Sequence, residues 1–139
     1  MTPTKAQLKG ISMTKAKPVR QMTRAQRAQQ IWSLLAWAAI SRQTLNYDIV
    51  ARLTGMPKQG VGDCLRPIQN YCLEKGLPAL TSIVVNEPTG RPSDGFIASV
   101  DIPGTHREVW KYPWLEEKAP TTAQFAAAYS IAPLRRSKK

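Results

Sequence analysis

The sequence predicts an α+β protein of the winged helix-turn-helix class. We expect three or four helices, a small antiparallel β-hairpin or three-stranded wing, and a short C-terminal helix. First, residues 44–85 have the pattern of a helix, a tight turn, a second helix and a strand. Second, turn-forming residues at 86–95 precede an alternating apolar and polar segment at 96–102, which is typical of a hairpin. Third, the basic residues are concentrated outside this central region.

The distribution of charge divides the chain into a body and two tails. Residues 1–21 are predicted to form a flexible basic arm, residues 22–130 the winged-helix domain, and residues 131–139 a basic C-terminal tail. The formal net charge is +11, and no acidic residue precedes Asp48. The segment from Asp48 to Leu134 is close to neutral, since it holds all 9 acidic residues and only eight basic ones. This distribution favours a polyanionic partner reached through the tails. The alternative is that the tails only increase solubility.

The first helix of the domain is predicted from Thr23 to about Ser41. Thr23 and Gln26 have the spacing of a capping box, in which each side chain pairs with an unpaired backbone N–H. Apolar residues recur at helical spacing and predict a buried face. This face contains Ala28, Ile31, Leu34, Leu35 and Ala38, and Trp32, Trp37 and Ile40 widen it. We expect both Trp residues in the core or in an interface, with base stacking as the alternative. A homodimer through this helix is one option.

Two further helices follow, joined by a tight turn. The second helix is predicted from Tyr47 to about Leu53, with Asn46 as its N-cap. Gly55 suits the left-handed position just past the end of this helix. Pro57 suits the first turn of the third helix, where its missing N–H is not needed.

The third helix is predicted to have one apolar and one polar face. The polar face contains Lys58, Gln59, Gly62, Asp63 and Arg66. If this helix enters the major groove of DNA, Gln59, Asp63 and Arg66 are candidates for contacts with base edges. Lys58 is a candidate for a phosphate contact, and Gly62 would allow close approach of the backbone. The alternative is an ordinary solvated helix face. Pro67 predicts a kink or break, followed by a helical segment at 68–74 that ends at Gly76.

The last third of the chain is predicted to contain strands and one helix. The β-branched run at 80–85 predicts a strand that pairs with 96–102, and residues 107–112 are a candidate third strand. Arg91, near the hairpin tip, is either a phosphate contact or a solvent-facing loop residue. A group of aromatic residues either forms a hydrophobic cluster or stacks on single-stranded bases. These residues are Trp110, Tyr112 and Trp114. A second capping-box spacing, Thr121 with Gln124, predicts a helix from Thr122 to about Tyr129.

Little in the sequence indicates catalysis or a membrane. On one helix, Cys64 and Cys72 would be separated by roughly 12 Å, which is too far for a disulfide. Two thiols without a signal peptide indicate a reducing compartment, so we expect a cytoplasmic location. The most apolar run, residues 31–40, is too short to span a bilayer, so no membrane partner is expected. With one His, two separated Cys and no phosphate-binding glycine motif, we expect no enzyme, cofactor or metal.

Residues 44–90 resemble a known DNA-binding domain. The motifs are Asn46-Tyr47-Asp48-Ile49-Val50-Ala51, Gly55, Val61-Gly62, Pro78 and Val84-Val85. They are similar to the winged helix of the O6-alkylguanine-DNA alkyltransferases and alkyltransferase-like proteins. The resemblance implies a helix inserted into the DNA groove, with Tyr47 against the DNA backbone. It does not imply alkyl transfer, because Thr81 stands at the reactive cysteine position and Gln59 at the intercalating arginine position. The histidine that activates the cysteine is also missing from its position.

Three functions are compatible with these features. The leading interpretation is a non-enzymatic, DNA-binding regulator or accessory factor of a bacterium, phage or mobile element, with double-stranded DNA as partner. The tails would supply much of its salt-sensitive affinity. The tail residues concerned are Lys15, Lys17, Arg20, Arg135 and Arg136. The second interpretation is a protein-interaction module, such as a phage-encoded inhibitor of a host nucleic-acid machine, which Asp63 and the neutral body favour. The third is an RNA-binding protein that uses the arm and the aromatic residues.

Overall fold

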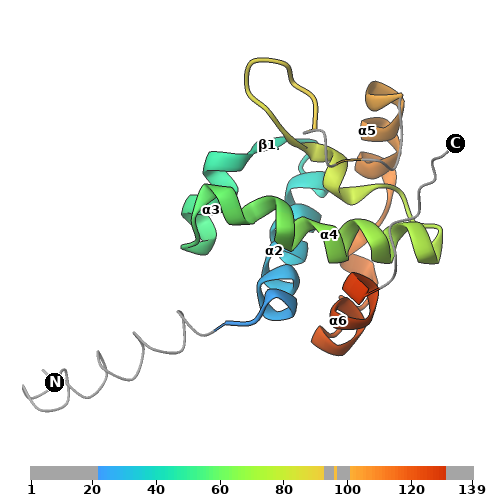
Figure 1. Ribbon diagram of the computed structural model, residues 1–139. Helices are drawn as coiled ribbons and strands as arrows, with labels where there is room; N and C mark the ends of the chain where they lie inside the picture. Colours follow the sequence, from blue (N-terminus) through green and yellow to red (C-terminus); the bar gives the residue numbers. More distant parts are fainter. Residues whose placement is uncertain (1–21, 93–95, 97–100, 131–139) are drawn as a thin grey trace, which may run out of the picture.

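A helical body with a very small sheet forms the part of the chain that the computed structural model describes, residues 22–92, 96 and 101–130 (Figure 1). The α-helices are α2 (Arg24–Ile40), α3 (Tyr47–Thr54), α4 (Lys58–Lys75), α5 (Ile102–Lys111) and α6 (Thr122–Ser130). Two 3-10 helices, η1 (Leu80–Ile83) and η2 (Trp114–Glu116), and two strands, β1 (Leu45–Asn46) and β2 (Val84–Val85), complete the described elements. The α+β class is therefore confirmed. Within it, α4 packs against α2, α3 and α6.

The predicted helix ends are confirmed, because they depend on local chemistry. Thr23 caps α2, and the reciprocal hydrogen bonds between Thr23 and Gln26 form the capping box. The Asn46 side chain accepts a hydrogen bond of 2.8 Å from the backbone N–H of Ile49 and caps α3. Gly55, at the end of α3, has a φ of 70°, in the left-handed region that favours glycine. Helix α4 starts directly after Pro57.

The centre of the core is a group of aromatic rings that joins α2, α4, η2 and α6. Trp32 of α2 meets Tyr71 and Trp114 edge to face, with ring centroids 5.8 and 5.5 Å apart. Phe125 of α6 packs against Trp32 at 5.9 Å and is fully buried. Trp32 is therefore a core residue, as predicted. Trp37 is not: it is 51% exposed, so the buried face of α2 is narrower than the sequence indicated.

Helix α4 continues through Pro67, so the predicted break is wrong. Proline removes one backbone hydrogen bond and crowds the preceding turn, at a cost of about 3 kcal/mol. Here Pro67 is buried, and the helix around it packs against both α2 and α6. Burial on two sides offsets the local cost. The predicted end at Gly76 is confirmed, with a φ of 69°.

Two predicted strands are wrong. Residues 80–83 form the 3-10 helix η1, and only Val84–Val85 extend as β2, which pairs in parallel with β1. All six residues from 80 to 85 are buried, so their apolar side chains reflect burial and not a half-exposed strand. Residues 107–112 lie mainly in α5, which Asp101 caps through the backbone N–H of Gly104. The described strands thus form a parallel pair and not a hairpin. Most of the expected hairpin's second strand, residues 97–100, lies outside the described residues.

Candidate nucleic-acid interface

Helices α3 and α4 are joined by a three-residue turn, Gly55, Met56 and Pro57. Such a turn between two helices, often with a glycine, is typical of a helix-turn-helix. Met56 is buried against the core, which holds the turn in place. On α4, the apolar side faces the body through Val61, Leu65 and Ile68, all buried as predicted.

The polar side of α4 is available at its N-terminal half. We call the residues Lys58, Gln59, Gly62, Asp63 and Arg66 the α4 stripe. Lys58, Gln59, Gly62 and Arg66 are exposed, and Asp63 is half-buried. A methyl group added at Gly62 would meet no heavy atom within 4 Å outside its own helix backbone and chain neighbours. The backbone of α4 is therefore open to close approach at this point.

The start of α3 lies next to the start of α4. The Lys58 ammonium is 3.4 Å from an Asp48 carboxylate oxygen, in a solvent-exposed ion pair. On the other side, the Asn46 amide donates to Glu87 of the following loop at 3.5 Å. Tyr47 lies between Asn46 and Asp48 in the sequence and is half-buried against the core. The candidates Tyr47 and Lys58 are thus the first residues of α3 and α4, and two acidic side chains contact this region, Asp48 at Lys58 and Glu87 at Asn46.

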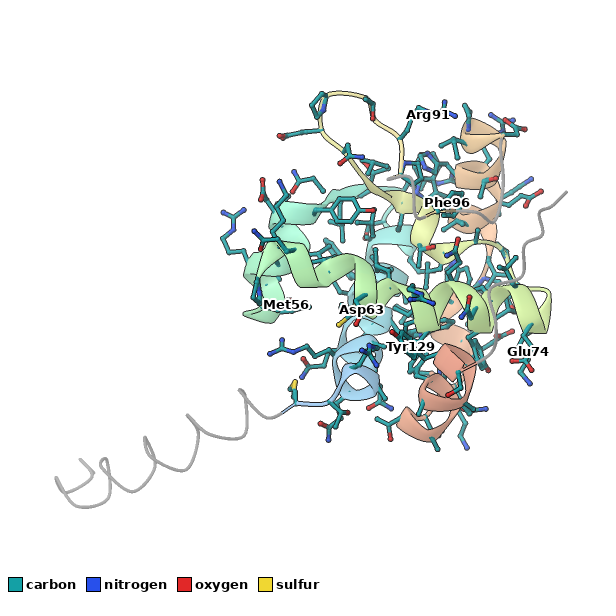
Figure 2. The ribbon with its side chains drawn as sticks, viewed as in Figure 1. Met56, Asp63, Glu74, Arg91, Phe96 and Tyr129 are labelled. Carbon is teal, nitrogen blue, oxygen red and sulfur yellow. The ribbon has the colours of Figure 1, made fainter. Side chains whose placement is uncertain are left out.

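Arg91 belongs to the exposed loop after β2. An isolated antiparallel bridge joins Asn86 and Arg91, and the Asn86 N–H donates to the Arg91 carbonyl at 2.8 Å. Figure 2 shows Arg91 near the top of the view and Asp63 near the centre of the molecule. The structure therefore does not bring Arg91 next to Asp63.

A cluster of four side chains lies at the C-terminal end of the α4 stripe; we call it the arginine–tyrosine cluster. Its members are Arg24, Asp63, Arg66 and Tyr129. Arg24 Nε donates to Asp63 Oδ2 at 2.6 Å, and the Tyr129 hydroxyl donates to Asp63 Oδ1 at 3.1 Å. The guanidinium carbons of Arg24 and Arg66 lie 3.9 and 4.9 Å from the Tyr129 ring centroid, within cation–π range. Figure 2 shows Asp63 and Tyr129 side by side.

The charge state of the cluster follows from these contacts. Burial raises the pKa of Asp63, but the hydrogen bonds from Arg24 and Tyr129 outweigh it, and the pKa is lowered below its usual value. The hydrogen bond to Asp63 raises the pKa of Arg24. At neutral pH the cluster therefore holds two cations and one anion. The Arg24–Asp63 pair is 41% and 44% exposed, so it contributes about 1 kcal/mol at most.

The two ends of the described body meet at this cluster. A groove of about 610 Å³ lies between the first turn of α2 and helix α6, with Pro67 of α4 at its edge. Thr23 and Ser130 both line it. The predicted arm joins the body just before Thr23, and the predicted tail joins it just after Ser130. The tail candidates Lys15, Lys17, Arg20, Arg135 and Arg136 themselves lie outside the described residues.

Arg24 and Tyr129 were not among the residues predicted from the sequence. They are 39 and 66 positions from Asp63, so no local spacing connects them to the α4 stripe. Arg24 carried one signal, because it directly follows the Thr23 cap and lies in the segment before Asp48 that has no acidic residue. Tyr129 carried no signal beyond its place at the end of the helix predicted from Thr122.

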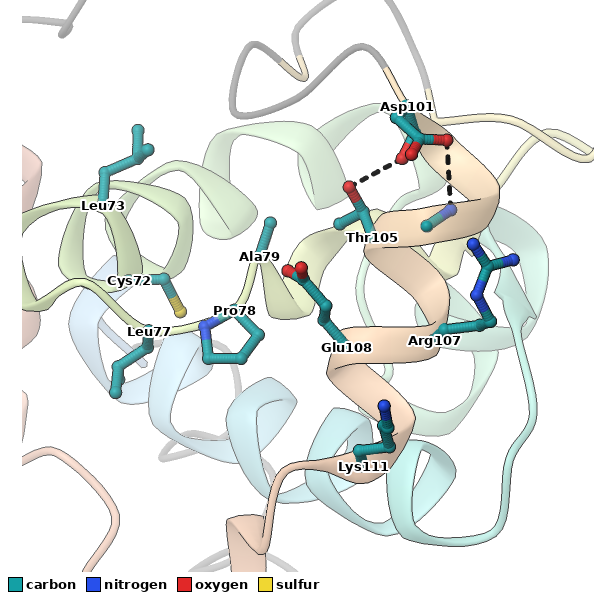
Figure 3. A pocket seen from close by; sticks show the side chains of 11 residues that line it. Cys72, Leu73, Leu77, Pro78, Ala79, Asp101, Thr105, Arg107, Glu108 and Lys111 are labelled. Carbon is teal, nitrogen blue, oxygen red and sulfur yellow. Dashed lines mark hydrogen bonds between the residues drawn. The ribbon is translucent and has the colours of Figure 1, made fainter.

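A second cavity, of about 550 Å³, lies between the end of α4 and α5 (Figure 3). One wall is largely apolar and includes Leu77 and Pro78. The other wall belongs to α5 and its cap and carries two acidic and two basic residues, Asp101, Arg107, Glu108 and Lys111. These four charges balance, so the cavity has no excess of positive charge that would favour an anion. The arginine–tyrosine cluster, with two cations and one anion, has such an excess.

The parts of the chain that the structure describes contain no group of three or more His, Cys, Asp or Glu side chains able to hold a metal ion. Cys64 and Cys72 are buried free thiols, as expected from their spacing. Burial raises the pKa of Cys72 to about 12, so its thiol stays protonated. Thr81, at the position aligned with the reactive cysteine, is buried, and the one histidine, His106, pairs with the Ser82 carbonyl at 2.8 Å.

No described helix has the length and apolar character needed to cross a membrane.

Comparisons of the chain with models of known protein families, with curated proteins and with solved structures found no match.

Proposed function

We propose that the protein binds double-stranded DNA without catalysing a reaction, through the α4 stripe and the two basic tails. In this proposal it acts in the cytoplasm as a regulator or accessory factor of a bacterium, phage or mobile element. Helix α4 approaches the major groove at Gly62, with Gln59 facing base edges and Lys58 facing a phosphate. The resemblance of residues 44–90 to the alkyltransferase winged helix supports the same orientation.

The observation that carries the proposal is that both basic tails join the body beside the α4 stripe. Residues 1–21 contain five basic residues, residues 131–139 contain four, and neither segment contains an acid. Thr23 and Ser130, next to these segments, line one groove beside the arginine–tyrosine cluster. Nine positive charges are therefore attached near one point of a body, residues 22–130, whose own net charge is only +2. Tethering at one point raises their effective concentration at any polyanion that α4 contacts.

Salt dependence tests this proposal with the full chain. The affinity for a labelled DNA duplex, measured by fluorescence anisotropy between 50 and 200 mM salt, should fall steeply because added salt makes the release of counterions from DNA less favourable. Replacing Lys15, Lys17 and Arg20 together by Gln should make the slope of log K against log salt shallower. The expected change is about 0.9 for each phosphate that these side chains neutralise in the wild type. The combined change Arg135→Gln and Arg136→Gln should act in the same direction.

A matched control is the double change Arg107→Gln and Lys111→Gln. It removes two positive charges from α5, which lines the second cavity and not the groove. The slope should stay unchanged in this variant. Absence of duplex binding at micromolar protein and low salt would contradict the proposal, as would tail variants that behave like the α5 control. Competition with single-stranded DNA and RNA separates duplex DNA from the RNA-binding alternative.

A second candidate function is binding to another protein. Large apolar side chains on the surface of the body favour it: Trp37 and Ile40 at the end of α2 are half exposed. A pull-down from host lysate with and without nuclease separates the two functions. A partner that stays bound after nuclease treatment, and does not bind a Trp37→Ser variant, would favour protein binding.

A further inference from the structure

We propose that Arg24, Arg66 and Tyr129 form a binding seat for a phosphate group of the DNA backbone, and that the Asp63 carboxylate occupies this seat in the free protein. This inference rests on the proposed DNA-binding function. It assigns Asp63 a role different from base recognition: an internal competitor that the phosphate displaces.

The geometry of the donors carries the inference. Two donors from different helices, Arg24 of α2 and Tyr129 of α6, each bind a different oxygen of one carboxylate on α4, at 2.6 and 3.1 Å. A phosphodiester also presents two anionic oxygens on one central atom, and arginine binds such pairs of oxygens well. The Asp63 carboxylate therefore occupies a position at which Arg24 and Tyr129 could donate the same two hydrogen bonds to a phosphate.

The balance of charge favours an external anion. The guanidinium groups of Arg24 and Arg66 both lie over the Tyr129 ring, so two cations surround a single carboxylate. Arg66 adds a further attraction that lowers the pKa of Asp63, and its side chain is exposed. When Asp63 turns away, two positive charges and a hydroxyl donor remain for the incoming phosphate.

Exchange of the two anions requires no opening of the core. The Arg24 and Asp63 side chains are 41% and 44% exposed, so solvent already reaches the pair. Exposed ion pairs are weak and are screened by salt. The Tyr129 ring lies at the groove where the tails join the body, which puts the seat next to the other proposed phosphate contacts.

The test is the variant Asp63→Asn in the full chain, measured with a labelled duplex between 50 and 200 mM salt. In the wild type, the displaced carboxylate keeps its negative charge close to the phosphate, and this repulsion offsets part of the attraction between the two arginines and DNA. Without this charge, the slope of log K against log salt should become steeper by up to about 0.9, the contribution of one phosphate charge, and binding at 50 mM salt should become tighter. The matched control is Glu74→Gln, which removes the same charge from the far end of α4, where the side chain is exposed (Figure 2). Its slope should equal that of the wild type.

A second variant keeps the test decisive if Asp63→Asn alters folding. Arg66→Gln changes an exposed side chain and should make the slope shallower by about 0.9, while loss of its contact with the Tyr129 ring should lower the melting temperature by no more than about 4 °C. An Asp63→Asn slope equal to that of Glu74→Gln, or an Arg66→Gln slope equal to that of the wild type, would overturn the seat. In either case the wild type still binds DNA, whereas failure of the proposed function would leave both the wild type and Glu74→Gln without duplex binding.

Discussion

Substitution of Gly62 tests whether the backbone of α4 comes close to DNA. Gly62 lies inside α4, where glycine destabilises a helix by about 1 kcal/mol relative to alanine. Since a methyl group there meets no heavy atom within 4 Å, Gly62→Ala should stabilise the protein by nearly this amount. For a domain of this size the melting temperature should rise by about 4 °C, measured by circular dichroism.

The larger variant Gly62→Leu separates stability from binding. Leucine has almost the same helix propensity as alanine, so the folded state should again gain stability. A leucine side chain at the open point of the stripe would, however, hold the helix away from the groove. We expect at least a tenfold loss of duplex affinity, which corresponds to about 1.4 kcal/mol.

The control for this pair is Ala127→Leu, which adds a leucine at an exposed position of α6 outside the stripe. Its duplex affinity should remain that of the wild type. If Gly62→Leu is more stable and binds duplex DNA as tightly as the wild type, α4 does not approach the groove at Gly62.

Two other predictions concern the body. Phe125→Ala removes a fully buried ring that anchors α6, and should lower the free energy of unfolding by about 3–5 kcal/mol in urea titrations. Leu115→Ala, at an exposed position, should change the free energy of unfolding by less than about 0.5 kcal/mol. If Phe125→Ala lowers the free energy of unfolding no more than Leu115→Ala does, α6 is not anchored through Phe125. The hydrogen bond to Glu117 raises the pKa of Tyr112 to about 12 from its usual 10. The stability that this hydrogen bond adds to the folded state is therefore fully present below pH 10 and is lost as the pH rises through 12. Absorbance titration should show a tyrosine that ionises near pH 12 and shifts toward pH 10 in Glu117→Gln; an unshifted curve would contradict the assignment.

Local chemistry made the helices around the candidate site predictable. Thr23 with Gln26, Asn46 and Gly55 each satisfy a helix end through neighbours in sequence, and each is found as predicted. The polar and apolar sides of α4 also follow from spacing alone. These helix ends and faces are determined by neighbouring residues in the sequence and do not depend on tertiary contacts.

Tertiary packing decided the features that were not predicted. Pro67 remains helical because α2 and α6 bury the helix around it. Residues 80–83 form a 3-10 helix although their composition favours a strand. All four side chains are buried, so they do not alternate between buried and exposed as in a half-exposed strand. The N-terminus of α5 did carry a local signal, because Asp101 is followed by Pro103 in the first turn.

The arginine–tyrosine cluster shows the same limit at the candidate site. Asp63 was assigned to the polar face correctly, but its partners come from α2 and α6, 39 and 66 positions away. A single sequence contains no spacing rule for such contacts. The position of Asp63 on the polar face of α4 therefore indicated contact with a DNA base. In the structure its carboxylate instead binds Arg24 and Tyr129 of the protein itself.

Nuclear magnetic resonance mapping of the full chain with a DNA duplex locates the binding surface residue by residue, and so tests whether α4 and the junctions of the two tails contact DNA. We expect backbone shift changes to concentrate on α4 from Lys58 to Arg66 and on the groove residues next to Thr23 and Ser130. Signals of α5 between Thr105 and Lys111 should stay in place. Changes confined to α5 or to the exposed end of α2 at Trp37, or no changes at all, would show that the protein does not bind DNA through α4.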